Sequence, residues 1–213
     1  MQLLHAKLDF AVGGQYNQFN ARKDGLNLLD SLKDYGYQMV YSVDELQQLA
    51  PGKSMAILSE RKPGDADERG DWMRVGLRKA LEELSRDGDG FVLMVEGSQI
   101  DWACHSNNFA HFVKEILEFD DLVGMAKAFA EADGNTLVVV TADHETGGMT
   151  VSPKADKKRR LTEKKLSRLV HFDRKSHSGT PVHVFAFGPG AEKFQGVMEN
   201  TAIHDTISLL MQP

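Results

Sequence analysis

Short apolar runs alternate along this chain with longer segments whose apolar residues recur at helical spacing. The clearest runs are residues 91–95 (Phe-Val-Leu-Met-Val) and 136–140 (Thr-Leu-Val-Val-Val). A continuous apolar run of this length is typical of a strand buried on both faces of a parallel sheet. We expect further strands at residues 8–12, 38–41, 56–58 and 182–187, and helices at residues 25–35, 43–49, 72–84, 109–132 and 200–211.

This alternation of strands and helices predicts the fold class. It favours an α/β fold in which a mostly parallel sheet has helices on both faces. With 213 residues the chain can bury a proper core, and we expect residues 1–213 to form a single domain. The charged segment 152–172 departs from the pattern, and we interpret it as an insertion or loop.

Acidic residues and a histidine follow the two clearest predicted strands. Glu96 comes directly after the first apolar run, and Asp143 and His144 come shortly after the second. In open α/β sheets, functional groups gather beyond the carboxyl ends of the strands. A carboxylate such as Glu96 suits magnesium, although bonding to backbone amides or to an arginine is the alternative. Asp143 and His144 can share a metal only on the turn beyond the strand, and a helix N-cap aspartate is the alternative there.

Three further residues are candidate metal ligands. Asp101 and His105 are four positions apart, so on a helix both side chains leave the same face and can grip one ion. Carboxylate and imidazole together suit zinc, whose catalytic sites keep one position open. A helical ion pair is the alternative for these two residues. His177 lies in a Ser-His-Ser-Gly loop, where a solvated histidine is the alternative.

Charge and cysteine usage narrow the partners. The net charge of −6 argues against nucleic acid or an anionic membrane surface as the main partner, and a phosphate-ester substrate would need bound cations. Cys104 is the one cysteine, so no intrachain disulfide can form, and we interpret this side chain as packing. We find no apolar run long enough to span a membrane, and the first residues are too short and polar a stretch for a signal peptide.

Taken together and in order, the motifs resemble the alkaline phosphatase family. The resemblance is carried by MVEGSQIDWACH, NTLVVVTADHETGGMT and HSGTPVHVFAFGPGAEKF, and it extends to FAVGGQYNQF and to the helix ending in DYGY. It covers nearly the whole chain and implies the C-terminal, metal-binding part of that fold. The family implies a phosphomonoesterase with two zinc ions and one magnesium ion, which works through a phosphoserine intermediate.

The resemblance also implies roles for individual residues. The implied ligands are Asp101, His105 and His177 for the first zinc, Asp143 and His144 for the second zinc, and Glu96 for magnesium. Trp102 falls where the side chain influences phosphate binding in this family. The resemblance further implies that the parent protein is a homodimer and is exported, although no export signal is visible in this sequence.

Three catalytic residues of the family cannot be identified here. They are the nucleophilic serine, the arginine that clamps phosphate, and an aspartate shared by the second zinc and magnesium. The one Asp-Ser pair, Asp30-Ser31, lies in a leucine-rich helical pattern. We therefore expect a complete first zinc site, partial second zinc and magnesium sites, and no turnover by this chain alone. The alternatives are a related metallo-phosphodiesterase, phosphomutase or sulfatase, or a zinc-binding fragment without catalysis.

Overall fold

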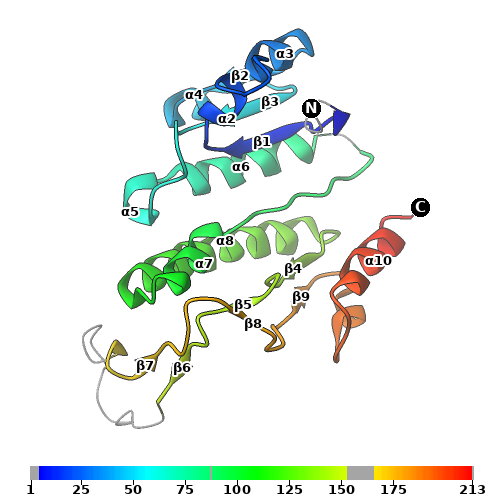
Figure 1. Cartoon of the computed structure of the whole chain (residues 1–213). Helices are drawn as coiled ribbons and strands as arrows, with labels where there is room; N and C mark the ends of the chain where they lie inside the picture. Colours follow the sequence, from blue (N-terminus) through cyan, green and yellow to red (C-terminus); the bar gives the residue numbers. More distant parts are fainter. Residues whose placement is uncertain (1–4, 87, 153–165, 213) are drawn as a thin grey trace. The chain divides into compact units, whose positions relative to one another are not determined.

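A computed structural model describes residues 5–86, 88–152 and 166–212 of the chain (Figure 1). The chain forms two compact units, Met1–Glu96 and Gly97–Pro213, and each is described by itself. That residues 1–213 make up one domain stays a prediction. Most of the predicted insertion at 152–172 lies outside the described residues. None of the described helices is long and apolar enough to cross a membrane.

The first unit is built on a parallel sheet of three strands. Its strands are β1 (Phe10–Gly13), β2 (Gln38–Val40) and β3 (Ser54–Ile57), in the order β1-β3-β2. The register runs from Phe10 opposite Ser54 to Gly13 opposite Ile57 on one side of β3. All four residues of β3 are buried, as expected for a central strand.

Helices cover both faces of this sheet. They are α2 (Asn17–Asn20), α3 (Leu28–Asp34), α4 (Val43–Gln47), α5 (Ala66–Arg69) and α6 (Trp72–Leu84), and Figure 1 shows α3 and α6 on opposite sides of the strands. Because neighbouring strand residues point to opposite faces, Met55 and Ile57 pack with α3, whereas Ala56 packs with α4 and α6. The predicted α/β class, with a parallel sheet and helices, is confirmed.

Local signals explain where α3 begins and which side it buries. The Asn27 side chain accepts a hydrogen bond from the backbone N–H of Leu29, which satisfies one free donor of the first turn. Leu29 and Leu32 are buried, whereas Asp30 is exposed. The apolar residues that recur at helical spacing in the sequence are therefore the ones that form the buried side of α3.

The second unit contains two neighbouring helices and three short antiparallel strand pairs. The helices α7 (Ser98–His105) and α8 (Phe109–Asp133) lie side by side (Figure 1). The pairs are β4 (Val138–Val140) with β9 (Phe185–Phe187), β5 (Glu145–Thr146) with β8 (His177–Ser178), and β6 (Thr150–Val151) with β7 (Val170–His171). The 3-10 helix η1 (Ala191–Phe194) and α10 (Thr201–Leu210) complete the unit.

The structure corrects one predicted strand and shortens two others by two or three residues. No strand is assigned at residues 91–95, where Val92 is 68% and Met94 is 84% exposed. An apolar run indicates burial, but a strand also needs a partner strand, and this segment belongs to none of the sheets of the described residues. The strands predicted at 136–140 and 182–187 shrink to β4 and β9, which pair antiparallel.

We expect the core of the first unit to depend on Leu32. Its side chain is 0% exposed, so Leu32→Ala should lower the free energy of unfolding by about 2–5 kcal/mol through lost burial and a new cavity. The matched control is Leu26→Ala, because Leu26 is 47% exposed. Urea unfolding of both variants measures the difference, and equal losses would contradict this description of the core.

Candidate metal centre

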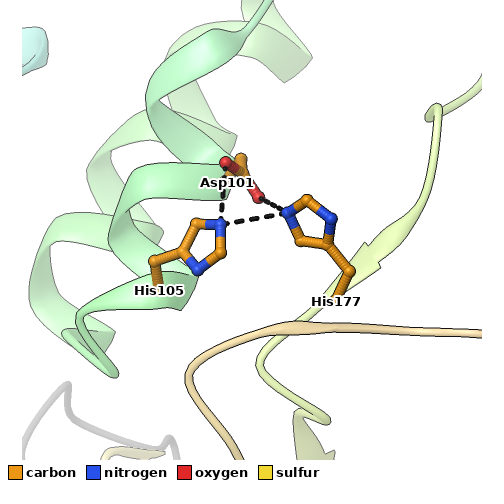
Figure 2. Close-up of side chains that lie close together, drawn as sticks. All are labelled: Asp101, His105 and His177. Atoms are coloured by element: carbon orange, nitrogen blue, oxygen red, sulfur yellow. Dashed lines mark hydrogen bonds and ion pairs between the residues drawn. The ribbon is translucent and has the colours of Figure 1, made fainter.

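Three side chains converge in the second unit on a point from which one ion could reach all of them (Figure 2). The Nε2 atom of His105 lies 3.4 Å from Oδ2 of Asp101 and 3.0 Å from Nε2 of His177. Nε2 of His177 lies 3.6 Å from Oδ1 of Asp101. One ligand atom from each of the three residues lies within 4.8 Å of the others, so the three residues form a compact set of donors.

Helix α7 supplies two of the three donors. Asp101 and His105 are four residues apart and leave the same face of α7, as predicted. Ala103 and Cys104 are buried, so other sides of the helix are packed. The side chains of Asp101 and His105 are 34% and 33% exposed, which leaves the donors accessible to solvent.

The pairing of β5 with β8 supplies the third donor. Thr146 lies opposite His177, and Glu145 lies opposite Ser178. The Glu145 carboxylate accepts hydrogen bonds from the Ser178 hydroxyl and, at 2.8 Å, from the backbone N–H of Gly148. The Ser178 hydrogen bond is the main reason that the pKa of Glu145 lies below its usual value. The two short strands are thus joined by side chains as well as by backbone.

A glycine turn joins the same two segments a second time. The Gly147 carbonyl accepts from the backbone N–H groups of Asp173 and Arg174 at 3.0 and 3.1 Å. Gly147 itself has φ +92°, and a Cβ atom there would come within 3.0 Å of the Phe172 ring. A residue without a side chain is therefore needed where this turn holds the segment leading to His177.

The hydrogen bonds of His105 show that the convergence suits a cation. Its Nδ1 lies 2.7 Å from the carbonyl oxygen of Lys175, which can only accept, so Nδ1 carries the proton. In a neutral ring the lone pair of Nε2 then faces the carboxylate of Asp101 and the ring nitrogen of His177. Acceptors that face one another in this way need a shared proton or a metal ion between them.

The spacing of the three donors fits zinc. A tetrahedral zinc ion with nitrogen and oxygen ligands at about 2.0–2.1 Å separates its donors by about 3.3 Å. The two Nε2 atoms lie 3.0 Å apart, and those of His105 and His177 lie 3.4 and 3.6 Å from different oxygens of Asp101, Oδ2 and Oδ1, so each contact is close to that value. Two imidazoles and one carboxylate also leave a fourth position open. The assignment of these three residues to a first zinc stays a prediction.

Asp143 and His144 form a second pair beside this cluster. Oδ2 of Asp143 lies 3.2 Å from Nε2 of His144, and both residues lie beyond the end of β4. The His144 ring stacks on the His177 ring, with 3.5 Å between centroids. The element that follows Asp143 is β5, so the alternative of a helix N-cap aspartate is wrong. Binding of a second zinc by this pair stays a prediction.

The two remaining predicted site residues are Trp102 and Glu96. Trp102 is 48% exposed, and its ring centroid lies 6.3 Å from that of His105, so it borders the cluster without joining it. Glu96 is an exposed residue at the end of the first unit, and its role as a magnesium ligand stays a prediction.

Two further residues agree with their sequence interpretation. Cys104 is buried, as expected of a packing residue. Ser31 lies within α3, where its hydroxyl donates to the Asn27 carbonyl. The Asp30-Ser31 pair is thus part of a helix, as its leucine-rich surroundings predict.

Sequence reasoning missed the residues that orient the ligands. Thr146, Glu145 and the carbonyl of Lys175 all contact or fix predicted ligands. Thr146 donates to Asp101, 45 positions away in the chain, so no local pattern could identify the contact. The sequence feature that could have pointed to Thr146 is its position two residues after His144.

An α/β fold with two imidazoles and a carboxylate around one point is typical of proteins that bind a divalent metal ion for chemistry. The family model for alkaline phosphatase matches residues 7–168 and 153–212, which is most of the chain. The chain therefore belongs to the alkaline phosphatase family, whose members are metal-dependent phosphoric monoester hydrolases that typically bind zinc and magnesium.

Individual relatives agree with this membership. Alkaline phosphatase 4 of Bacillus subtilis is 29% identical over 258 residues, covering 92% of this chain and 56% of the relative. Streptomycin-6-phosphate phosphatase of Streptomyces griseus is 32% identical over 255 residues, covering 97% of this chain and 56% of the relative. The chain thus spans little more than half the length of these curated relatives.

A solved structure supports the same fold. Alkaline phosphatase from the Antarctic bacterium TAB5 matches with a TM-score of 0.87 and 36% identity, covering 98% of this chain and 62% of that one. A variant of the TAB5 enzyme has been solved with Mg bound in its M3 site.

We expect Cys104 to be unreactive in the folded chain. Burial raises the pKa of its thiol to about 11, with help from the charges of Asp101 and Glu145. At pH 8 the thiolate fraction should therefore be about 100-fold lower than for an ordinary cysteine, before steric protection is counted. Iodoacetamide labelling with and without urea measures this, and equal rates would contradict the buried placement.

Proposed function

We propose that this chain is the metal-binding part of an alkaline phosphatase that hydrolyses phosphate monoesters. The observation that carries the proposal is the convergence of Asp101, His105 and His177 on one point, at separations that suit a tetrahedral ion. Family membership supports the reaction class. The name of the Streptomyces griseus relative supports a phosphorylated small molecule as a substrate.

The proposed cofactors are two zinc ions and one magnesium ion. Asp101, His105 and His177 would hold the first zinc, Asp143 and His144 would contribute to the second, and Glu96 would contribute to magnesium. When bound, two such ions stabilise the attacking and leaving oxygens of an in-line displacement and offset the substrate's negative charge. The chain's own residues bind the ions and keep the imidazole rings in the tautomer that offers Nε2.

We propose a phosphoserine intermediate, with the serine and the phosphate-clamping arginine supplied from outside this sequence. The family resemblance supports this mechanism, and the helical setting of Asp30-Ser31 is a reason to look elsewhere for the nucleophile. A homodimeric, exported parent protein rests on the resemblance alone. A phosphodiesterase, phosphomutase or sulfatase is a weaker candidate, because family membership favours the monoesterase.

The first test measures hydrolysis of p-nitrophenyl phosphate at alkaline pH, with zinc and magnesium added, together with bound zinc. We expect the purified chain to bind zinc and to show no turnover, because it supplies ligands without a nucleophile. His105→Ala should lose the zinc bound at this centre, since it removes one of three donors. The matched control is His204→Ala, because the His204 side chain is 82% exposed on α10.

Two results would contradict the proposal in different ways. Zinc binding that survives in His105→Ala would show that the ion binds elsewhere. Turnover by the wild-type chain that is lost in His105→Ala would confirm the centre, but it would refute an external nucleophile. A chain that binds zinc without any phosphatase role in the whole protein would be the non-catalytic alternative.

A further inference from the structure

Thr146 lies between the two candidate metal clusters. Its Oγ1 atom lies 2.5 Å from Oδ1 of Asp101 and 3.2 Å from Nδ1 of His144. The residue is 9% exposed, so water has little access to compete for these bonds. One hydroxyl therefore contacts a predicted ligand of the first zinc and a predicted ligand of the second.

The chemistry of the partners sets the direction of both hydrogen bonds. A threonine hydroxyl has one proton, and an ionised carboxylate can only accept, so the proton points to Asp101. The Thr146 oxygen then accepts from Nδ1–H of His144. A neutral His144 ring is thereby held in the tautomer whose Nε2 lone pair faces Asp143, at 3.2 Å from Oδ2.

The backbone of Thr146 holds a third residue of the clusters. Thr146 is paired with His177 in the β5–β8 ladder, and the His177 ring in turn stacks on His144. The position is thus connected to Asp101 and His144 through its side chain and to His177 through its main chain.

We propose that Thr146 is a positioning residue that couples the two metal centres, because its hydroxyl orients Asp101 and fixes the tautomer of His144. The coupling rests on the proposed function for the identity of the ions. The hydrogen-bond chain itself rests only on the contacts above. Outer residues that fix ligand orientation in this way typically change metal affinity by about 10–100-fold when they are lost.

The first experiment compares zinc affinity among matched variants of the purified chain, by competition with a chromophoric chelator. Thr146→Val removes the hydroxyl and keeps the branched shape, so zinc affinity at the Asp101 centre should fall by about 10–100-fold. Thr146→Ser keeps the hydroxyl and should bind zinc nearly as the wild type does. Thr150→Val is the control, because Thr150 is an exposed residue of β6.

Equal zinc affinity of wild type and Thr146→Val would overturn the proposal. Circular dichroism of each variant shows whether the fold is kept. If Thr146→Val does not fold, the tautomer of His144 in the wild-type chain, measured as described below, still decides the question.

The second experiment needs no metal and no activity. Long-range ¹H–¹⁵N correlation spectra of the metal-free chain at alkaline pH report which ring nitrogen of His144 carries the proton. We expect Nδ1–H in the wild type and in Thr146→Ser, and a shift towards Nε2–H in Thr146→Val. A wild-type His144 with its proton on Nε2 would refute the hydrogen-bond chain.

A double-mutant cycle tests the coupling itself. His144→Ala removes both the donor to Thr146 and the stacking on His177, so part of its effect on zinc affinity at the Asp101 centre bypasses Thr146. In the Thr146→Val background only that stacking part should remain, which makes the two effects non-additive. Strictly additive effects would show that Thr146 does not link the clusters.

The two experiments separate this inference from the proposed function. A wild-type chain that binds no zinc at the Asp101 centre would overturn the proposed function and the metal part of the coupling. The His144 tautomer would still confirm or refute the role of the hydroxyl.

Discussion

The pairing of β5 with β8 is the contact on which the candidate metal centre depends. Two residues from each strand bring the Asp143-His144 turn close to His177, the first residue of β8, across a sequence separation of more than 30 residues. So short a ladder is marginal by its backbone bonds alone. The Glu145–Ser178 hydrogen bond and the Gly147 turn reinforce it, and both lie within a few residues of the ligands.

The parts of the site that depend on local geometry could be predicted from the sequence, whereas those that depend on long-range contacts could not. The Asp101–His105 spacing was predictable from helix periodicity, because four residues on a helix return to the same face. The residues after β4 do follow the end of a strand, as predicted, but β4 pairs antiparallel with β9, so the rule for parallel sheets does not by itself account for their position. The role of Thr146 was not predictable, since its hydroxyl bonds a carboxylate 45 positions away.

The fold likewise has elements that the sequence predicts and one that it does not. The buried leucines of α3 and the parallel sheet of the first unit follow from apolar periodicity. Residues 91–95 have the composition of a buried strand, yet Met94 is 84% exposed and no strand is assigned there. Hydrophobic pattern indicates which residues favour burial, whereas strand formation also depends on a partner that the pattern does not encode.

The negative charge of the chain bears on what the candidate metal centre could do. A chain with a net charge of −6 is poorly suited to bind a phosphate ester unless cations lie at the site. The Lys175 carbonyl fixes the His105 ring so that its lone pair points at a carboxylate and at a second imidazole. Such an arrangement is favourable once a cation lies among the donors, and that cation would supply the positive charge that the chain lacks.

The central claim is that Asp101, His105 and His177 share one zinc ion, and X-ray absorption at the zinc edge tests it most directly. The chain loaded with one equivalent of zinc should show two imidazole ligands at about 2.0 Å and oxygen in the remaining positions. The His177→Ala variant should show one imidazole fewer. A spectrum without imidazole scattering, or one that is unchanged in the variant, would contradict the account.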